Sequence, residues 1–157
     1  FRSWKGDLLG VPGLMRQRKP RITVVHLESH DLGHGHEKGV RGRTGLQAYL
    51  SAVQQTDRGI GCVVDWVKSD PEFRDCTAVV IRPEFGRDDL VTKSGELHHS
   101  EGFYSAHRVA SIFWGPDFNK GIDDTTVVNR RDLSPTLSRL FNLGVLVTGQ
   151  PLPGLLR

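Results

Sequence analysis

The side chains best suited to chemistry in this sequence gather in residues 29–36, which read SHDLGHGH. This stretch holds three imidazoles and one carboxylate, and its two glycines allow the backbone to fold tightly around a bound ion. Imidazole nitrogens and carboxylate oxygens are ligands of zinc and of other divalent cations. The stretch therefore predicts a metal site, and the competing interpretation is a polar loop that only faces solvent.

A second polar stretch, residues 83–89 (PEFGRDD), directly follows an apolar run. Glu84 stands at the carboxyl end of that run, where it can ligate a metal, and the Arg87 guanidinium can bind an anionic oxygen through two N–H donors. The alternative is a surface turn that carries a salt bridge. His98 and His99 form a third signal. Because adjacent side chains on a loop point apart, at most one of them is expected to ligate a given metal.

Short apolar runs are predicted to form the strands that position these residues. Residues 22–27 (ITVVHL) and 77–81 (TAVVI) are typical of buried strands, and residues 108–114 (RVASIFW) are typical of a third. His26 lies inside the first run and His107 beside the third. Both are predicted to pack rather than to ligate a metal.

A long helix is predicted between the first two strands. Thr44 and Gln47 form a capping box at its start, and residues 69–71 (SDP) end it. Between them, apolar residues recur at spacings of three, four and seven, which is the mark of one helix face: Leu46, Leu50, Val53, Ile60, Val64 and Val67. A shorter helix is expected over residues 132–142 and a last edge strand over residues 144–148.

This order of strand, long helix, strand, strand and helix predicts an α/β fold in which a mostly parallel sheet is sandwiched by helices. Ligands of such sheets bind at the carboxyl ends of the strands, where the polar loops begin. Residues 21–148 are expected to form one domain. A linker or loop over residues 1–20 would precede it, and a C-terminal tail over residues 149–157 would follow it.

Composition narrows the function classes further. Hydrophobic residues make up 37% and charged residues 25% of the 157 residues, which is ordinary for a globular domain. The net charge is only +3 and no basic stripe with interleaved aromatic residues stands out, so no nucleic-acid partner is predicted. No apolar run approaches the roughly 20 residues that cross a bilayer, so no transmembrane segment is expected. Cys62 and Cys76 are predicted to be buried free thiols.

Several stretches, taken in this order, resemble the alkaline phosphatase superfamily of phosphatases, phosphodiesterases, sulfatases and cofactor-independent phosphoglycerate mutases. Residues 46–68 are similar to the helix that follows the family's first metal loop. Residues 113–121 (FWGPDFNKG) look like the family's Gly-Pro turn, and residues 132–137 (DLSPTL) look like the start of its later helix. The resemblance covers about residues 22–143.

The resemblance implies an alkaline-phosphatase-like fold, incomplete in this chain, and a metal site. In that family an Asp, a His four residues later and a His from a later loop hold one metal. His34 and His99 match the two histidines. The remaining position is filled either by His30, four residues before His34, or by Asp31 through a shifted loop. The implied cofactor is a divalent metal, with zinc as the first choice and manganese or calcium as alternatives.

A second metal would be held in the family by an Asp-His pair, whose place Glu84 and Phe85 take here. Glutamate can ligate a metal and phenylalanine cannot. Arg87 would steady the anionic group of a phosphate or sulfate ester. The family's earlier strand and its nucleophilic Ser or Thr have no counterpart in residues 1–20, so no nucleophile is assigned.

Two main functions fit this pattern. The first is a metal-dependent, hydrolase-like domain for phosphate or sulfate esters, present as a fragment or a split chain. The second is a non-catalytic structural or interaction subunit, which would need no cofactor; a simple metal- or anion-binding module is a third. The small apolar sheet is expected to be completed by another polypeptide or by a missing N-terminal segment. Export of many family members favours a periplasmic or secreted location.

Overall fold

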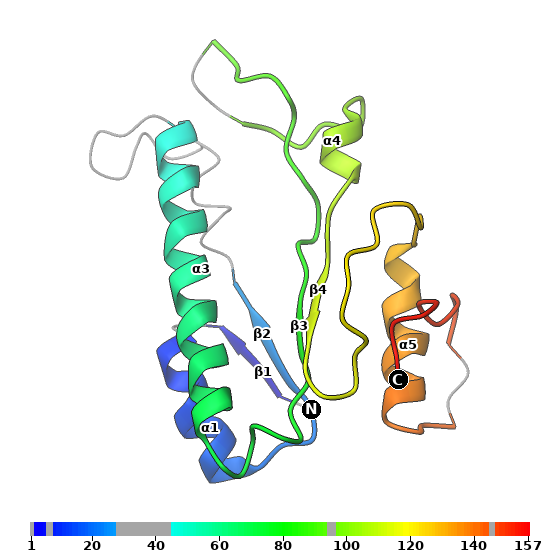
Figure 1. The fold of residues 1–157 in the computed structure, drawn as a ribbon. Helices are drawn as coiled ribbons and strands as arrows, with labels where there is room; N and C mark the ends of the chain where they lie inside the picture. The colour runs from blue at the N-terminus through cyan, green and yellow to red at the C-terminus, as the bar shows by residue number, and fades with distance from the viewer. Residues whose placement is uncertain (1, 6–7, 28–44, 94–96, 145–146) are drawn as a thin grey trace. The chain divides into compact units, whose positions relative to one another are not determined.

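The computed structural model describes residues 2–5, 8–27, 45–93, 97–144 and 147–157 (Figure 1). The chain divides into two compact units, one made of Phe1–Arg74 and Ile81–Ile112 and the other of Asp75–Val80 and Phe113–Arg157. The sequence predicts one domain over residues 21–148, and the structure splits this region between the two units. The elements in chain order are β1 (Arg2–Lys5), η1 (Leu8–Gly10), α1 (Val11–Arg18), β2 (Thr23–His26), α3 (Gly45–Ser69), β3 (Val79–Ile81), α4 (Tyr104–His107), β4 (Ile112–Trp114), η3 (Arg130–Asp132) and α5 (Leu133–Leu140).

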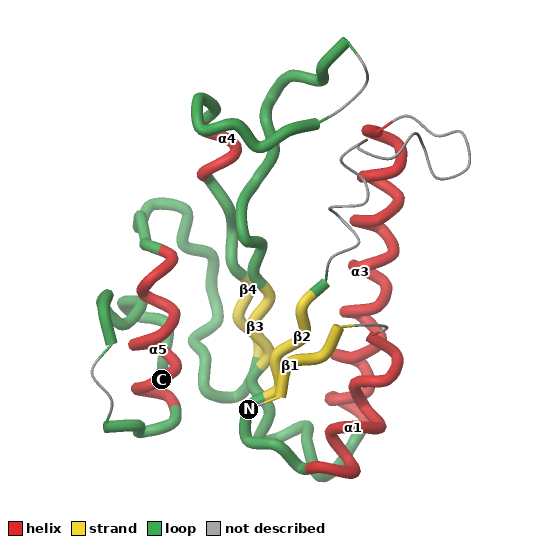
Figure 2. Tube along the Cα trace, turned by 180° about the vertical axis from the view of Figure 1, so that it is seen from behind, coloured by secondary structure: helices red, strands yellow, loops and turns green. Residues whose placement is uncertain are grey.

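The described strands form two separate two-stranded sheets instead of one larger sheet. β1 and β2 are parallel, and their register runs from Arg2 opposite Thr23 to Lys5 opposite His26. β3 and β4 pair with each other, and they lie side by side in both views (Figure 1 and Figure 2). The predicted α/β fold of the alkaline phosphatase type, with a mostly parallel sheet sandwiched by helices, is therefore wrong.

Exposed β-branched side chains show that these strands are not sandwiched between helices. Val24 in β2 is 38% exposed, and Ile112 in β4 is 58% exposed. A short apolar run has the same composition in a central strand and in a small two-stranded sheet, so the pattern alone does not separate the two. β3 and β4 have three residues each, and the described residues of the expected edge strand at 144–148 form no strand.

The long helix expected from the apolar period is confirmed as α3. Its apolar stripe ends in Val67, which is fully buried, whereas Leu50 and Val53 near the start of the helix are 50% and 38% exposed. The helix ends before Asp70, whose side chain accepts a hydrogen bond from the backbone N–H of Glu72 at 2.9 Å. Within α3, the C-terminal half therefore contributes more to the core of the first unit than the N-terminal half does.

Residues 1–20, predicted to be a linker or loop, instead contain β1, η1 and α1. Val11 and Met15 of α1 stand four residues apart on one helix face, and both are buried. Pro12 lies in the first turn, where the missing N–H of proline has no cost. A helix of eight residues is too short to show a sustained apolar period, which is why the sequence pattern does not reveal it.

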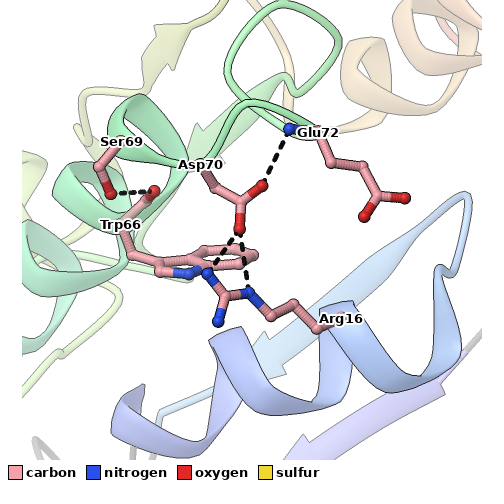
Figure 3. Close-up of polar contacts among 5 residues, drawn as sticks. All are labelled: Arg16, Trp66, Ser69, Asp70 and Glu72. Carbon is pink, nitrogen blue, oxygen red and sulfur yellow. Dashed lines mark hydrogen bonds and ion pairs between the residues drawn. The ribbon is translucent and has the colours of Figure 1, made fainter.

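Arg16 of α1 forms a salt bridge with Asp70, the residue that follows α3 (Figure 3). Its Nε and Nη2 atoms donate to Asp70 Oδ2 at 3.0 and 2.8 Å. The Arg16 guanidinium also lies 5.6 Å from the centroid of the Trp66 ring, and Trp66 packs against the buried Phe73 at 5.0 Å between ring centroids. Asp70 is only 6% exposed, and a buried carboxylate needs such partners to stay charged.

The Arg16–Asp70 pair predicts a pH-dependent part of the stability. Hydrogen bonding from Arg16 holds the pKa of Asp70 below its ordinary value of 3.8. Because the folded-state pKa is the lower one, the stabilisation is present above the unfolded pKa and is lost as the pH falls through the folded pKa. Arg16→Gln should therefore lower the thermal unfolding midpoint at neutral pH, and its difference from the wild type should shrink in strong acid. Arg18→Gln serves as the control, and equal midpoints for all three proteins at neutral pH would contradict the prediction.

In the second unit, the start of α5 holds the C-terminal tail. The Thr136 side chain is fully buried, donates to the backbone carbonyl of Asp132, and accepts from the backbone N–H of Leu152 at 2.8 Å. Asp132 Oδ1 in turn accepts from the backbone N–H of Gln150 at 2.9 Å. The DLSPTL motif at residues 132–137 therefore has a structural role in this chain, because it anchors residues 150–152.

Four side chains that were predicted to be buried or packed are exposed: Cys62, Cys76, His26 and His107. Cys62 lies outside the α3 stripe that leads to Val67, and this explains its exposure. His26 is exposed because β2 is not sandwiched between two layers of helices. The packing prediction is therefore wrong for these residues.

Candidate functional site

A hairpin between β3 and β4 carries the candidate residues that the structure describes. The backbone N–H of Gly86 on one arm donates to the carbonyl of Ala106 on the other at 2.8 Å. A Cβ atom on Gly86 would lie 2.1 Å from the carbonyl oxygen of Ser105, so only glycine permits this close approach. The glycine of the PEFGRDD stretch therefore joins the two arms and places its neighbours in the sequence opposite residues 97–108.

Phe85 is the centre of a small cluster that brings two predicted site residues together. Its ring centroid lies 4.2 Å from that of His99, with an angle of 35° between the ring planes. The Arg87 guanidinium carbon lies 5.7 Å from the Phe85 centroid and 5.1 Å from the centroid of Tyr49, which belongs to α3. The hairpin thus gathers a cation and an imidazole around one aromatic ring.

The exposure of the cluster suits the binding of a polar ligand. His99 is exposed, whereas Phe85, Arg87 and Tyr49 are half-buried. A guanidinium that stacks on aromatic rings uses its faces for this contact, and its N–H edge is the part that recognises oxyanions in a bidentate manner. The ring nitrogens of His99 likewise lie at the edge of a stacked ring. A cation and an imidazole, the two groups that could serve an anion and a metal, thus contact the same aromatic ring.

The remaining predicted ligands are only partly placed. Glu84 is exposed. Three other predicted ligands lie outside the described residues: His30, Asp31 and His34. Within the described part of the chain, no group of three or more His, Cys, Asp or Glu side chains is arranged to hold a metal ion. The structure therefore brings His99 and Arg87 together and leaves the full ligand set of the metal as a prediction.

The donor chemistry of the two described candidate ligands fits a divalent cation. His99 offers an imidazole nitrogen and Glu84 a carboxylate oxygen, both of which zinc accepts. A zinc site needs three or four protein ligands, so further donors are required, and the sequence offers them in residues 29–36. Phe85 places an apolar ring against His99 at the position where the resemblance implies an imidazole. The described residues by themselves therefore do not complete a metal site.

Two residues of this cluster were missed by reasoning from the sequence. Tyr49 lies beside the apolar stripe of α3, and no motif connects it with Arg87, almost forty positions away. Asp88 follows Arg87 in the PEFGRDD stretch but was not assigned a role. It is only 8% exposed, and its backbone N–H donates to the carbonyl of His98 at 2.9 Å. Both contacts depend on how the hairpin folds back, which periodicity does not reveal.

Comparisons with protein-family models, with curated proteins and with solved structures find no match to this chain. None of the helices in the described residues combines the length and the apolar character needed to cross a membrane. Function must therefore be argued from the chemistry of the site itself.

Proposed function

We propose that this chain is a metal-dependent, hydrolase-like domain that binds phosphate or sulfate esters at the hairpin between β3 and β4. The observation that supports this most directly is the contact that Arg87 and His99 share with the Phe85 ring. Arg87 would bind an anionic oxygen of the ester through its N–H edge. His99 would contribute one nitrogen ligand to a divalent metal, for which zinc is the first candidate.

The other ligands of this metal are proposed from the sequence. His34 and either His30 or Asp31 would complete the set, and Glu84 would support a second metal if one binds. A divalent metal in such a site supplies Lewis-acid polarisation of the ester oxygen. No nucleophile is assigned in this chain, so turnover would depend on a nucleophile supplied by another segment or another chain.

The proposal rests on the residues and not on the fold. The two small sheets differ from the sandwiched sheet that the resemblance implies, so analogy at the level of fold gives no support. The remaining support is the order of the chemical groups along the chain. A His- and Asp-rich stretch precedes a helix of 25 residues, and a strand then leads to Glu84, Arg87 and His99.

Metal content and ester hydrolysis test this proposal. After dialysis against zinc and then against metal-free buffer, the protein should retain about one zinc ion per chain. A chelator should then lower its thermal unfolding midpoint, because a ligand that binds only the folded state stabilises it. Hydrolysis of p-nitrophenyl phosphate and p-nitrophenyl sulfate should be measured on the same sample. A protein that retains no metal and unfolds at the same temperature with and without chelator would contradict the proposal.

A non-catalytic structural or interaction subunit is the second candidate, and Phe85 is the observation that favours it. The Phe85 ring contacts both Arg87 and His99, and it cannot ligate a metal or transfer a proton. Retention of zinc without hydrolysis of either ester, even with a partner chain present, would favour this alternative. Hydrolysis that depends on the metal would exclude it.

We also propose that a further polypeptide segment pairs with the exposed strands. A two-stranded sheet is marginally stable alone, and β1 and β2 are each an edge strand that another strand could extend. The partner would be another chain or a segment that precedes residue 1 in a longer protein. Light scattering should then show assembly, and a stable, well-behaved monomer of 17.5 kDa would contradict this.

A further inference from the structure

A cavity of about 290 Å³ lies within the second unit, between the end of α5, the turn that follows β4 and the C-terminal tail. Pockets that bind small molecules have volumes of about 300–1,000 Å³, so this cavity suits a ligand at the small end of that range. All of its lining residues belong to the second unit and none to the hairpin between β3 and β4: Pro116, Asp117, Arg139, Leu140, Leu156 and Arg157.

Backbone pairing and a buried hydroxyl hold the walls of this cavity together. Phe118 of the turn forms an antiparallel bridge with Leu156 of the tail, and Phe118 is only 3% exposed. On the side of α5, the buried Thr136 hydroxyl accepts from the backbone N–H of Leu152 at 2.8 Å. The tail is thus tied both to the turn and to α5. A cavity that is formed before binding costs little further ordering when a ligand enters.

The polar and apolar side chains of the cavity differ in exposure. Arg139, Arg157 and Asp117 are exposed, whereas Leu140 and Leu156 are half-buried. Within the described residues, neither guanidinium makes a hydrogen bond or an ion pair. Two planar sets of N–H donors are therefore available to a bound oxyanion, next to an apolar surface.

The charge of the lining favours a ligand with a single negative charge. Two guanidinium groups and the Asp117 carboxylate leave one positive charge on the lining side chains. The cost of removing an anion from water grows with the square of its charge, whereas its attraction to a fixed site grows only in proportion to that charge. A site with a small positive excess therefore suits a monoanion better than a dianion.

We infer that this cavity binds a small organic carboxylate. The carboxylate would accept hydrogen bonds from the N–H edges of Arg139 and Arg157, whose fork geometry matches its two oxygens. The apolar body of the ligand would lie against Leu140 and Leu156. The inference concerns the second unit alone and does not depend on the function proposed for the hairpin.

Binding of benzoate, followed by the backbone amide NMR signals of the whole chain at constant ionic strength, tests this inference. The signals of Leu140 and Leu156 should shift and saturate as benzoate is added. Acetate lacks an apolar body and should bind about tenfold more weakly, because it buries less apolar surface. Phenyl phosphate carries a second negative charge near neutral pH and should shift these two signals less than benzoate does at the same concentration.

Substitutions of the lining arginines show whether the cavity itself binds benzoate. Arg139→Gln should weaken binding by about tenfold or more, the usual effect of losing hydrogen bonds to a charged group. Arg139→Lys keeps the charge but not the fork, so it should recover only part of the loss. Arg131→Gln is the matched control, because Arg131 is an exposed arginine of the same unit that does not line the cavity. It should bind benzoate as the wild type does.

Three results would overturn the inference. The first is a shift of Leu140 and Leu156 that does not saturate or that acetate reproduces at the same concentration, since this would indicate unspecific ion pairing. The second is equal benzoate affinity in Arg139→Gln and Arg131→Gln. The third is tighter binding of phenyl phosphate than of benzoate at these two signals. Arg87→Gln should leave benzoate binding at this cavity unchanged, which separates it from the hairpin site.

Discussion

Replacing His99 by alanine is expected to weaken zinc binding by more than about 100-fold, because loss of a direct ligand costs more than loss of a supporting residue. Zinc would then keep only the donors that the sequence places in residues 29–36, with Glu84 as a further contributor. The fold should survive, since the His99 side chain is exposed. Competition with a chromophoric chelator measures the affinity, and circular dichroism verifies the fold.

His98→Ala is the matched control for this substitution. The two histidines are adjacent, and the His99 ring stacks on Phe85 at 4.2 Å between ring centroids. The backbone carbonyl of His98, which accepts from Asp88, is kept in the alanine variant. Zinc affinity should therefore stay at the wild-type value. If His98→Ala abolished binding and His99→Ala did not, the ligand would be assigned to the wrong histidine.

Phe73→Ala should lower the free energy of unfolding by about 3–5 kcal/mol, the usual cost of removing a buried aromatic ring. Phe73 is 8% exposed and packs 5.0 Å from the Trp66 ring, on which Arg16 also stacks. The loss would leave a cavity between the end of α3 and the loop that follows it. Urea unfolding followed by Trp fluorescence measures the difference.

The control for Phe73→Ala is Ile122→Ala. Ile122 is equally apolar but 96% exposed, so its removal should change the free energy of unfolding by less than about 0.5 kcal/mol. Similar values for the two variants would mean that the packing of Phe73 against Trp66 is not part of the stable core.

The helical part of the structure could be predicted from the sequence where the helix is long. The apolar stripe from Leu46 to Val67 repeats over several turns, and the Ser-Asp-Pro sequence ends it, so α3 is found with nearly the correct bounds. The α1 helix has only eight residues and a single buried pair, Val11 and Met15, so no period could reveal it. Periodicity is informative in proportion to the number of turns over which it is sampled.

The sheets could not be predicted in the same way. Residues 22–27 and 77–81 do contain the strands β2 and β3. The number and direction of their partner strands, however, depend on long-range pairing that a run of a few apolar residues does not encode. For the same reason, the sequence does not reveal that Val24 and Ile112 are exposed. The order of short strands therefore predicts the fold class less reliably than the composition of each run predicts a strand.

The candidate site could be predicted from the sequence in part, less completely than α3 and better than the sheets. The sequence singled out Arg87 and His99 from their chemistry, and the structure brings both onto the Phe85 ring. Their closeness depends on the approach of the hairpin arms at Gly86 and on the contacts of Asp88, which have no periodic signature. Residue type therefore predicts the two candidate residues, whereas the residues that support them are identified only from the fold of the hairpin.

The central claim is that Arg87 and His99 serve one ligand site, and binding of phenyl phosphate with and without zinc tests it most directly. If one site holds both the anion and the metal, zinc should tighten phenyl phosphate binding, and phenyl phosphate should tighten zinc binding by the same factor. Arg87→Gln should abolish this mutual effect while leaving zinc binding alone intact. Isothermal titration that shows phenyl phosphate binding to be independent of zinc, or unaffected by Arg87→Gln, would contradict the claim.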